Sequence, residues 1–306
     1  MPLSAQIRAD LVLLLVTLLA AAGWIFSKQA LVELPPLLFM GLRFLLAGSV
    51  LLLFCRDGWQ QVKEQRVLVS LVGLGCLMAA ALFCWILGLQ RSLHLGTGAF
   101  IASLGILLVP LMAWLLYRER APRSTWLSLL VALSGLALLF LEKGVSLTAG
   151  QGWFLMAALL FSVHFTLISR FAVAIPTVIL TAIQLLVVGV LGIMLSALGE
   201  SWPSTLSWPT LGWFLASALI ATSVRFALQT YAQSLAPASH VALIMTLEPV
   251  WAALLAGLWY GERMTWMQFA GSCLIFSAMF ISRWYWVKRA MHAFTRDCQE
   301  ADRPLS

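Results

Sequence analysis

The chain is short of charge. Only 10% of its 306 residues are charged, whereas soluble domains carry about 25%. Hydrophobic residues make up 62%, and the mean hydropathy is +0.96. This balance excludes an ordinary soluble domain and indicates a protein that crosses a membrane several times.

Sequence signatures of catalysis are absent too. The five cysteines include no CxxC pair, and the chain has no HExxH, no phosphate-binding loop and no Ser/His/Asp arrangement. We therefore predict no enzyme activity, no metal and no cofactor, and the missing Walker motif argues against ATP-driven transport. The net charge of +7 forms no basic stripe, which argues against a nucleic-acid partner.

Long apolar runs are what the chain has most of. Each can cross a hydrocarbon core of about 30 Å as a helix, whereas open strands cannot satisfy their backbone in lipid. The connections between the runs are short. We predict an all-α integral membrane protein with ten transmembrane helices, at residues 11–30, 35–55, 67–88, 95–116, 124–141, 150–172, 176–198, 210–231, 239–260 and 265–286.

The sequence repeats itself at an offset of 143 residues. Gln90 aligns with Gln233, and Glu119 aligns with Glu262, without a gap. Each half then has five helices, and an odd number inverts the second half relative to the first. Inverted repeats are typical of transporters, which bind substrate at the midplane between the halves; a duplication kept only for packing is the alternative. We predict repeats at 1–143 and 144–286 and a cytoplasmic tail at 287–306.

Positive charge is shared unevenly between the two ends of these helices. With both termini in the cytoplasm, 13 of the 19 Lys and Arg residues lie on the cytoplasmic side and four lie outside, while Arg43 and Arg225 lie within helices. Cytoplasmic connections carry an excess of Lys and Arg. We therefore predict that both termini are cytoplasmic.

The ninth predicted helix carries an acid and a helix breaker side by side, Glu248 and Pro249. A carboxylate at the membrane centre costs roughly 3 kcal/mol on insertion scales. Pro249 has no N–H, so the carbonyl of Met245 loses its helical partner. Protein or water must take up these groups, which indicates a binding site inside the bundle. A kinked helix in which Glu248 is only a packing partner is the alternative.

Polar side chains on the eighth predicted helix form one stripe. Thr222, Arg225, Gln229 and Gln233 recur at spacings of 3, 4 and 4 residues, so they should face the bundle interior or water. Arg225 and Glu248 differ in depth by only about 5 Å at 1.5 Å per residue, which predicts an ion pair. Arg225 would bind an anionic or zwitterionic group, and Glu248 a cation or a proton. A structural salt bridge is the alternative.

Aromatic side chains complete this candidate site. Trp24, Trp85 and Trp251 lie away from the helix ends, and Trp251 follows Glu248 by three residues, on the same face. Aromatic walls suit amphipathic organic substrates and cations. Packing or lipid-facing aromatics are the alternative. Tyr231, on the eighth helix, is a further candidate.

Four other features have less specific meanings. His164 is a lone histidine, a candidate for substrate binding or for a hydrogen bond between helices. Arg43 lies in the middle of the second helix, and we favour a structural role for it. Pro110 is a second helix-breaking candidate. The GxxxG of Gly257 and Gly261 allows the close helix approach of a homodimer.

Three stretches resemble the EamA family of the drug/metabolite transporter superfamily. They read ALIMTLEPVWAALLAGLWYGERMTWMQFAGSCLIFSAMF in the second half, and PPLLFMGLRFLLAG and TGAFIASLGILLVPLMAWLLYRERAPRSTWLSLLVALSGLALL in the first. The resemblance covers about residues 10–285. It implies a carrier of the bacterial inner membrane whose central cavity, lined by helices 1, 3, 4, 6, 8 and 9, opens alternately to either side. The sequence departs from it where Gly105 and Ile106 occupy the positions of Glu248 and Pro249.

These observations predict a secondary transporter that moves small organic metabolites, amino acids or drugs across the bacterial inner membrane by alternating access, in the export direction. Its predicted partners are membrane lipids, the small-molecule substrate and protons. An integral-membrane enzyme acting on lipids is one alternative, which would need clustered acids or histidines at one membrane face. A non-transporting membrane scaffold is the other.

Overall fold

The computed structural model describes residues 3–55, 62, 64–91, 95–140, 149–261, 265–278 and 280–281, and every regular element in these residues is helical. Nine described helices are long and apolar enough to cross a membrane. The tenth predicted span is helical over 266–278. The all-α fold with ten transmembrane helices is confirmed, and the predicted tail at 287–306 lies outside the described residues.

The first five spans are single helices. The predicted bounds agree with the structure to within a few residues, except that the first helix begins well before residue 11. It extends for 28 residues, longer than a membrane requires. The helices are α1 (Leu3–Ala30), α2 (Pro36–Leu53), α4 (Gln65–Arg91), α5 (Leu95–Tyr117) and α6 (Arg123–Phe140).

The second half differs because two of its spans are interrupted. The sixth and seventh spans are single helices, α7 (Ala149–Ala174) and α8 (Thr177–Gly199). The eighth span consists of α9 (Trp208–Ala218), a π-helical turn η1 (Leu219–Val224) and α10 (Arg225–Leu235). The ninth consists of α11 (Ala238–Met245) and α12 (Glu248–Tyr260).

Local sequence explains where helices begin. Pro36 occupies the first turn of α2, and Pro237 precedes α11 directly, positions where the missing N–H of proline costs nothing. The free amides at the start of α2 are bound by an acid from the other half. Glu200, just after α8, accepts hydrogen bonds from the backbone nitrogens of Leu37 at 2.9 Å and Leu38 at 2.8 Å. This cap ties the two repeats together.

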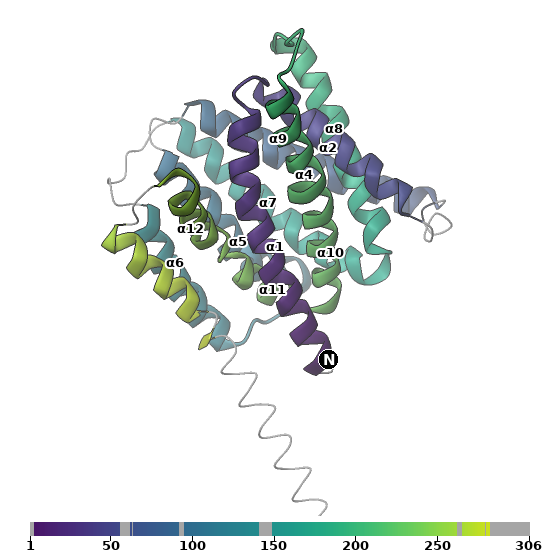
Figure 1. The fold of residues 1–306 in the computed structure, drawn as a ribbon. Helices are drawn as coiled ribbons and strands as arrows, with labels where there is room; N and C mark the ends of the chain where they lie inside the picture. Colours follow the sequence, from purple (N-terminus) through teal and green to yellow (C-terminus); the bar gives the residue numbers. More distant parts are fainter. Residues whose placement is uncertain are drawn as a thin grey trace, which may run out of the picture.

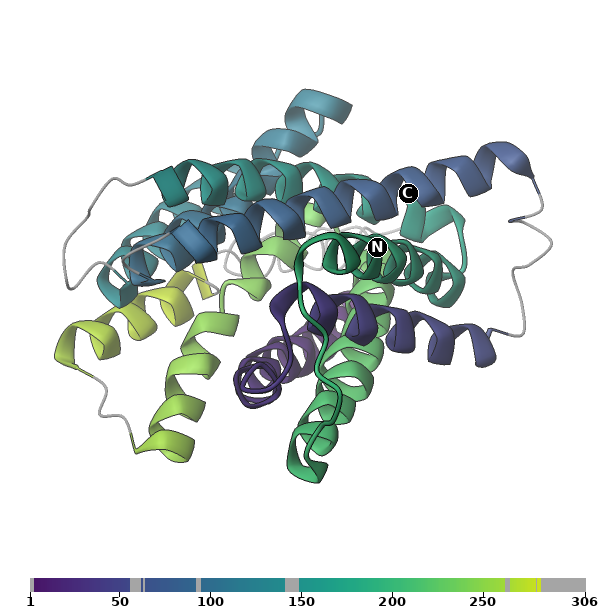
Figure 2. The same ribbon diagram turned by 90° about the horizontal axis from the view of Figure 1, so that it is seen from above.

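Five helical segments from both repeats form a ring. Each of α1, α10, α7, α5 and the α11–α12 pair contacts the next in this order, and α1 closes the ring against α11 and α12. In Figure 1, α1 crosses the front of the molecule beside α10, with α12 and α6 on its other side. Seen from above, α1 is nearly end-on while α4 runs across the view (Figure 2). The helices are therefore strongly tilted relative to one another.

Two helix pairs pack outside this ring. Helix α2 lies along α8, and α6 packs against the helix of the tenth span, residues 266–278. A methyl group on Gly135 of α6 would lie 2.6 Å from the carbonyl oxygen of Gly271, and one on Gly271 would lie 2.6 Å from that of Gly135. Small residues thus let the fifth and tenth spans touch backbone to backbone. Gly261 ends α12 with φ of 68°, a conformation that accounts for this glycine without a dimer.

Candidate functional site

The ninth span breaks where the sequence places its acid and proline. Thr246 and Leu247 separate α11 from α12, and Glu248 is the first residue of α12. The backbone nitrogens of Thr246 and Leu247 bond three residues back, at 3.2 and 3.0 Å, so the chain tightens before it restarts. The ninth span is thus interrupted directly before Pro249, where the sequence places a helix breaker. The carboxylate of Glu248 lies at the positive end of a half-helix, which favours its negative charge.

The carboxylate of Glu248 joins three helices. One oxygen accepts a hydrogen bond from Nε1 of Trp24 on α1, at 3.0 Å. The other oxygen lies 3.6 Å from a terminal guanidinium nitrogen of Arg225 on α10. The predicted ion pair is therefore present. The side chains of Arg225 and Glu248 remain 15% and 21% exposed, so the pair is neither at the surface nor sealed.

A second arginine lies beside this pair, which the sequence did not identify as part of the site. Arg43 of α2 donates to the hydroxyls of Thr222 and Ser27, the latter at 2.9 Å, and to the carbonyl of Ala221 at 3.4 Å. Thr222 and Ala221 belong to the π-helical turn, which directly precedes Arg225. Such turns are frequent at functional sites. The position of Arg43 in the middle of a span was the feature of the sequence that could have assigned it to the site.

The polar stripe of the eighth span points inward, as predicted, but its members face different neighbours. Thr222 bonds to Arg43 of α2, while Gln233 donates to α7, to the hydroxyl of Ser169 at 3.1 Å and to the carbonyl of Phe165 at 3.3 Å. Gln229, between them, is only 8% exposed. Among the described residues, its Oε1 and the Nε of Arg225 have no hydrogen-bond partner.

Two of the three candidate tryptophans meet at the site. The rings of Trp24 and Trp85 of α4 pack edge to face, with centroids 5.9 Å apart, and Trp24 is 49% exposed. The ring of Trp251 packs edge to face on Phe276 of the tenth span, with centroids 6.1 Å apart, so its place in the site stays a prediction.

Two further candidates lie elsewhere. His164 of α7 is buried, and its Nε2 lies 2.6 Å from Oε1 of Gln184 on α8. The amide nitrogen of Gln184 donates to Leu180, so the histidine donates in this bond. His164 therefore links two helices instead of facing Glu248. Tyr231 is half-buried on α10, and no hydrogen bond between described residues joins its hydroxyl to Arg225 or Glu248.

The first repeat has no break at its own proline. Pro110 lies inside α5, which continues from Leu95 to Tyr117. The expectation that Pro110 interrupts its helix is wrong. A single proline removes one backbone hydrogen bond, and a spanning helix tolerates this loss when neighbouring helices support it. Val109 and Ala113 beside it are buried, so that support is present.

A second titratable pair was missed by the sequence reasoning. His240 of α11 lies 2.7 Å from a carboxylate oxygen of Asp10 on α1, and Asp10 is buried. Each residue lies near the end of a predicted span, where charge is ordinary, so nothing in the sequence distinguished them. Together with the Trp24–Glu248 bond, this pair ties α1 to both halves of the broken ninth span.

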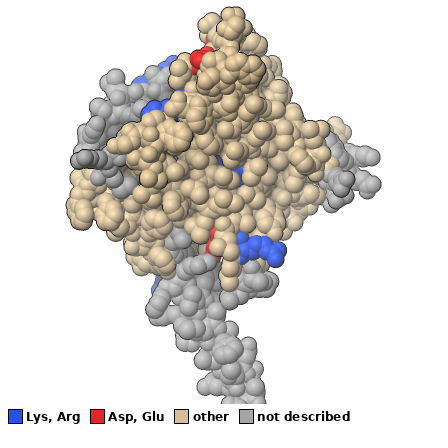
Figure 3. Space-filling model, in the orientation of Figure 1, with Lys and Arg blue, Asp and Glu red and all other residues tan. Residues whose placement is uncertain are grey.

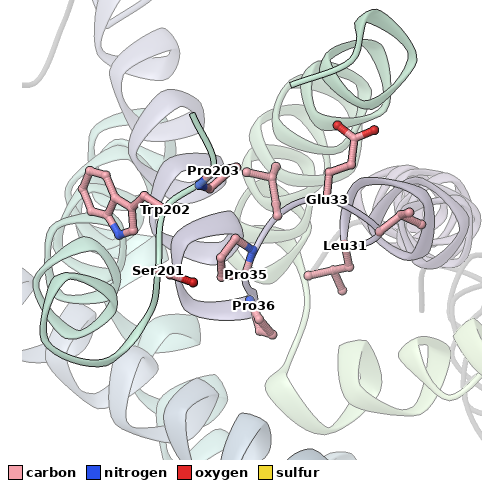
Figure 4. Close-up of a pocket in the computed structure, with 9 residues that line it drawn as sticks. Leu31, Glu33, Pro35, Pro36, Ser201, Trp202 and Pro203 are labelled. Carbon is pink, nitrogen blue, oxygen red and sulfur yellow. The ribbon is translucent and has the colours of Figure 1, made fainter. Parts of the chain in front are cut away.

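The surface charge and the position of a pocket both bear on the choice of functional site. The face in Figure 3 is almost wholly uncharged, with charge at its edges and one small basic patch in the middle. A pocket of about 450 Å³ lies instead between the α1–α2 and α8–α9 connections (Figure 4). Its lining includes Glu33, Pro35 and Trp202, and none of the candidate site residues. The charged cluster around Glu248 remains the better functional candidate, because its groups are costly in lipid.

A bundle of two inverted five-helix repeats, with a broken helix and an ion pair where the repeats meet, defines a multi-pass membrane protein of the transporter type. The chain belongs to the EamA-like transporter family, which it matches over residues 7–141 and 148–284. This confirms the resemblance seen in the sequence.

Individual relatives agree with this assignment. The chain is 26% identical over 276 residues to an uncharacterized transporter of Archaeoglobus fulgidus, covering 90% of this chain and 86% of that protein. It is 25% identical over 272 residues to the uncharacterized transporter YetK of Bacillus subtilis, covering 84% and 81%. A solved crystal structure has a TM-score of 0.76 at 19% identity, covering 90% of this chain and 96% of that chain, and shares the fold.

Proposed function

We propose that the protein is a secondary transporter, and not an enzyme, that moves small organic molecules across the bacterial inner membrane by alternating access. One observation carries this proposal. The ion pair of Arg225 and Glu248 lies at a helix break, within spans, at the meeting of α1, α10 and α12. Charged groups within spans usually mark substrate pathways in membrane proteins, because placing a charge in lipid costs free energy and such groups are rare without a functional role.

The position of the pair suits a binding site whose access alternates. Trp24 belongs to the first repeat, whereas Arg225 and Glu248 belong to the second. Any rocking of one repeat against the other therefore changes the contacts of the Glu248 carboxylate. The carboxylate and guanidinium are partly exposed, so a substrate can reach them and exchange with one of the partners.

Direction and energy form the second part of the proposal. The bias of Lys and Arg supports cytoplasmic termini, and we propose export driven by an electrochemical gradient. One elementary charge crossing 100 mV is worth about 2.3 kcal/mol. In proteoliposomes, transport by a proton-coupled carrier is expected to collapse when an uncoupler is added. Transport that is insensitive to the uncoupler would leave exchange or facilitated diffusion.

Purified protein in proteoliposomes, screened against a panel of labelled metabolites, tests the proposal. Glu248→Gln and Arg225→Met are expected to lower the initial rate at least about tenfold, which corresponds to about 1.4 kcal/mol. Glu119→Gln is the matched control. It removes a carboxylate from an exposed pair with Arg170, at 2.7 Å, and is expected to transport normally.

Three results would contradict the proposal. Normal rates in both site variants would make the Arg225–Glu248 pair a structural salt bridge. Turnover of membrane lipid without transport would favour the enzyme alternative. Vesicles in which the wild-type protein moves no compound of the panel would favour a scaffold.

A further inference from the structure

Among the described residues, the site holds more positive charge than negative. Two guanidinium groups, Arg43 and Arg225, lie at the meeting of α1, α2 and α10, together with the carboxylate of Glu248. The acceptors of Arg43 in the described part of the chain are neutral: two hydroxyls and a backbone carbonyl. Each positive charge in a poorly hydrated region is costly unless it is paired. One further negative charge would balance the cluster.

Three buried polar atoms of α10 have no partner among the described residues. They are Nε of Arg225, which must donate, and Oε1 of Gln229 and of Gln233, which must accept. Arg225 and Gln229 are four apart on one helix, so their side chains are neighbours on the same face, whereas Gln233 lies a further turn away from Arg225. Buried polar groups are nearly always hydrogen-bonded. A ligand that satisfies Nε of Arg225 and Oε1 of Gln229 presents an acceptor and a donor close together.

An aromatic wall adjoins these atoms. Trp24 bonds to Glu248, packs on Trp85 and leaves 49% of its own surface exposed. Phe226 lies under the guanidinium of Arg225, with 4.3 Å from the guanidinium carbon to the ring centroid. Aromatic walls bind apolar and aromatic bodies.

We propose that the cargo is an organic monoanion, a carboxylate with a hydroxyl group on the adjacent carbon and an apolar or aromatic body. The carboxylate accepts from Nε of Arg225, and the hydroxyl donates to Oε1 of Gln229. Its single negative charge balances the excess positive charge of the cluster. An ammonium group in place of the hydroxyl would restore that excess, so a zwitterion binds less well. This inference rests on the proposed transport function.

The test measures binding, so that its outcome is separate from transport. Purified protein in lipid nanodiscs is titrated calorimetrically with four probes that share a phenyl body: phenyllactate, phenylpropionate, phenylalanine and phenethylamine. Phenyllactate is expected to bind most tightly. Phenylpropionate, which lacks one hydrogen bond of typical strength, is expected to bind about fivefold more weakly. Phenylalanine is expected to be weaker than phenyllactate, and phenethylamine not to bind.

Three variants assign the contacts. Gln229→Leu is expected to abolish the preference for phenyllactate while phenylpropionate still binds, which also shows that the variant is folded. Arg225→Met is expected to lose both acids. Gln233→Leu is the matched control: its Oε1 is also unpartnered, but Gln233 lies two turns from Arg225 along α10, and its side-chain nitrogen is held by Ser169 of α7. It is expected to retain the wild-type order of the four probes.

Three outcomes would overturn the inference: tighter binding of phenylalanine or phenethylamine than of phenyllactate, an unchanged preference in Gln229→Leu, or no binding of any probe. None of these bears on the proposed function when proteoliposomes still transport another compound. Binding of the acids without transport of any labelled compound would instead refute the proposed function and leave the binding site in place.

Discussion

Replacing Glu248 by Gln tests the energetic weight of the central ion pair. The substitution removes the charge that faces Arg225 but keeps the size of the side chain and an acceptor for Trp24. At 3.6 Å and an effective dielectric constant of about 20, the attraction amounts to roughly 5 kcal/mol as an upper bound. Because both side chains are partly exposed, we expect the free energy of unfolding to fall by about 2 kcal/mol.

The assay is denaturant unfolding in mixed micelles, followed by helical circular dichroism. Arg225→Met is expected to cost a similar amount, and the double variant less than the sum of the two, since neither charge is then left unpaired. Glu119→Gln breaks a shorter pair, at 2.7 Å, whose side chains are 52% and 45% exposed, and should cost less than about 0.5 kcal/mol. An equal cost at both pairs, or additive single effects at the central pair, would refute this reasoning.

Two further predictions concern the scaffold. The Cβ of Gly135→Val would lie about 2.6 Å from the carbonyl oxygen of Gly271. This substitution is expected to lower the free energy of unfolding by about 2 kcal/mol in the same assay. Gly73→Val is the control that should cost clearly less, because no atom of another helix lies within 4 Å of that position. Hydrogen bonds from the hydroxyl and backbone nitrogen of Ser207 hold the pKa of Glu33 below its usual 4.5. Its contribution to stability is therefore present above about pH 4.5 and lost as the pH falls through its lower folded value. Glu33→Gln should flatten the decline in unfolding midpoint below pH 4.5, and an unchanged decline would contradict this assignment.

The features predicted from the sequence are those that depend on local pattern. Ten apolar runs predict ten helices, because a segment that crosses lipid on its own must satisfy its backbone hydrogen bonds internally, as a helix does. Glu248 and Pro249 fix the break, because a missing N–H acts within one turn of its own residue. Arg225 and Glu248 could be paired because their depths follow from counting residues along two helices of known rise.

The features that the sequence reasoning missed depend on how distant helices face one another. Arg43 became part of the site only through contacts with Ser27 of α1 and with the π-helical turn, which spacing rules for a regular helix do not anticipate. The contact of Trp251 with Phe276 was not foreseen, because counting three residues from Glu248 identifies a face of α12 but not the helix that covers that face. The contact of Asp10 with His240 joins residues 230 positions apart.

The two repeats share a scaffold but have diverged at the position of the site. Gly105 of α5 corresponds to Glu248 at the offset of 143 residues. A methyl group on Gly105 would lie 2.8 Å from the carbonyl oxygen of Ala158 on α7, so the first repeat is closely packed there and α5 remains unbroken. In the second repeat the equivalent helix is broken, and its acid reaches Trp24 of α1 instead of packing against a backbone. The acid of the charged cluster therefore has a glycine, and not a second carboxylate, at the equivalent position of the first repeat. A substrate bound by Arg225 and Glu248 would contact the two halves unequally, so their motion can differ between the loaded and empty protein even though their folds are alike.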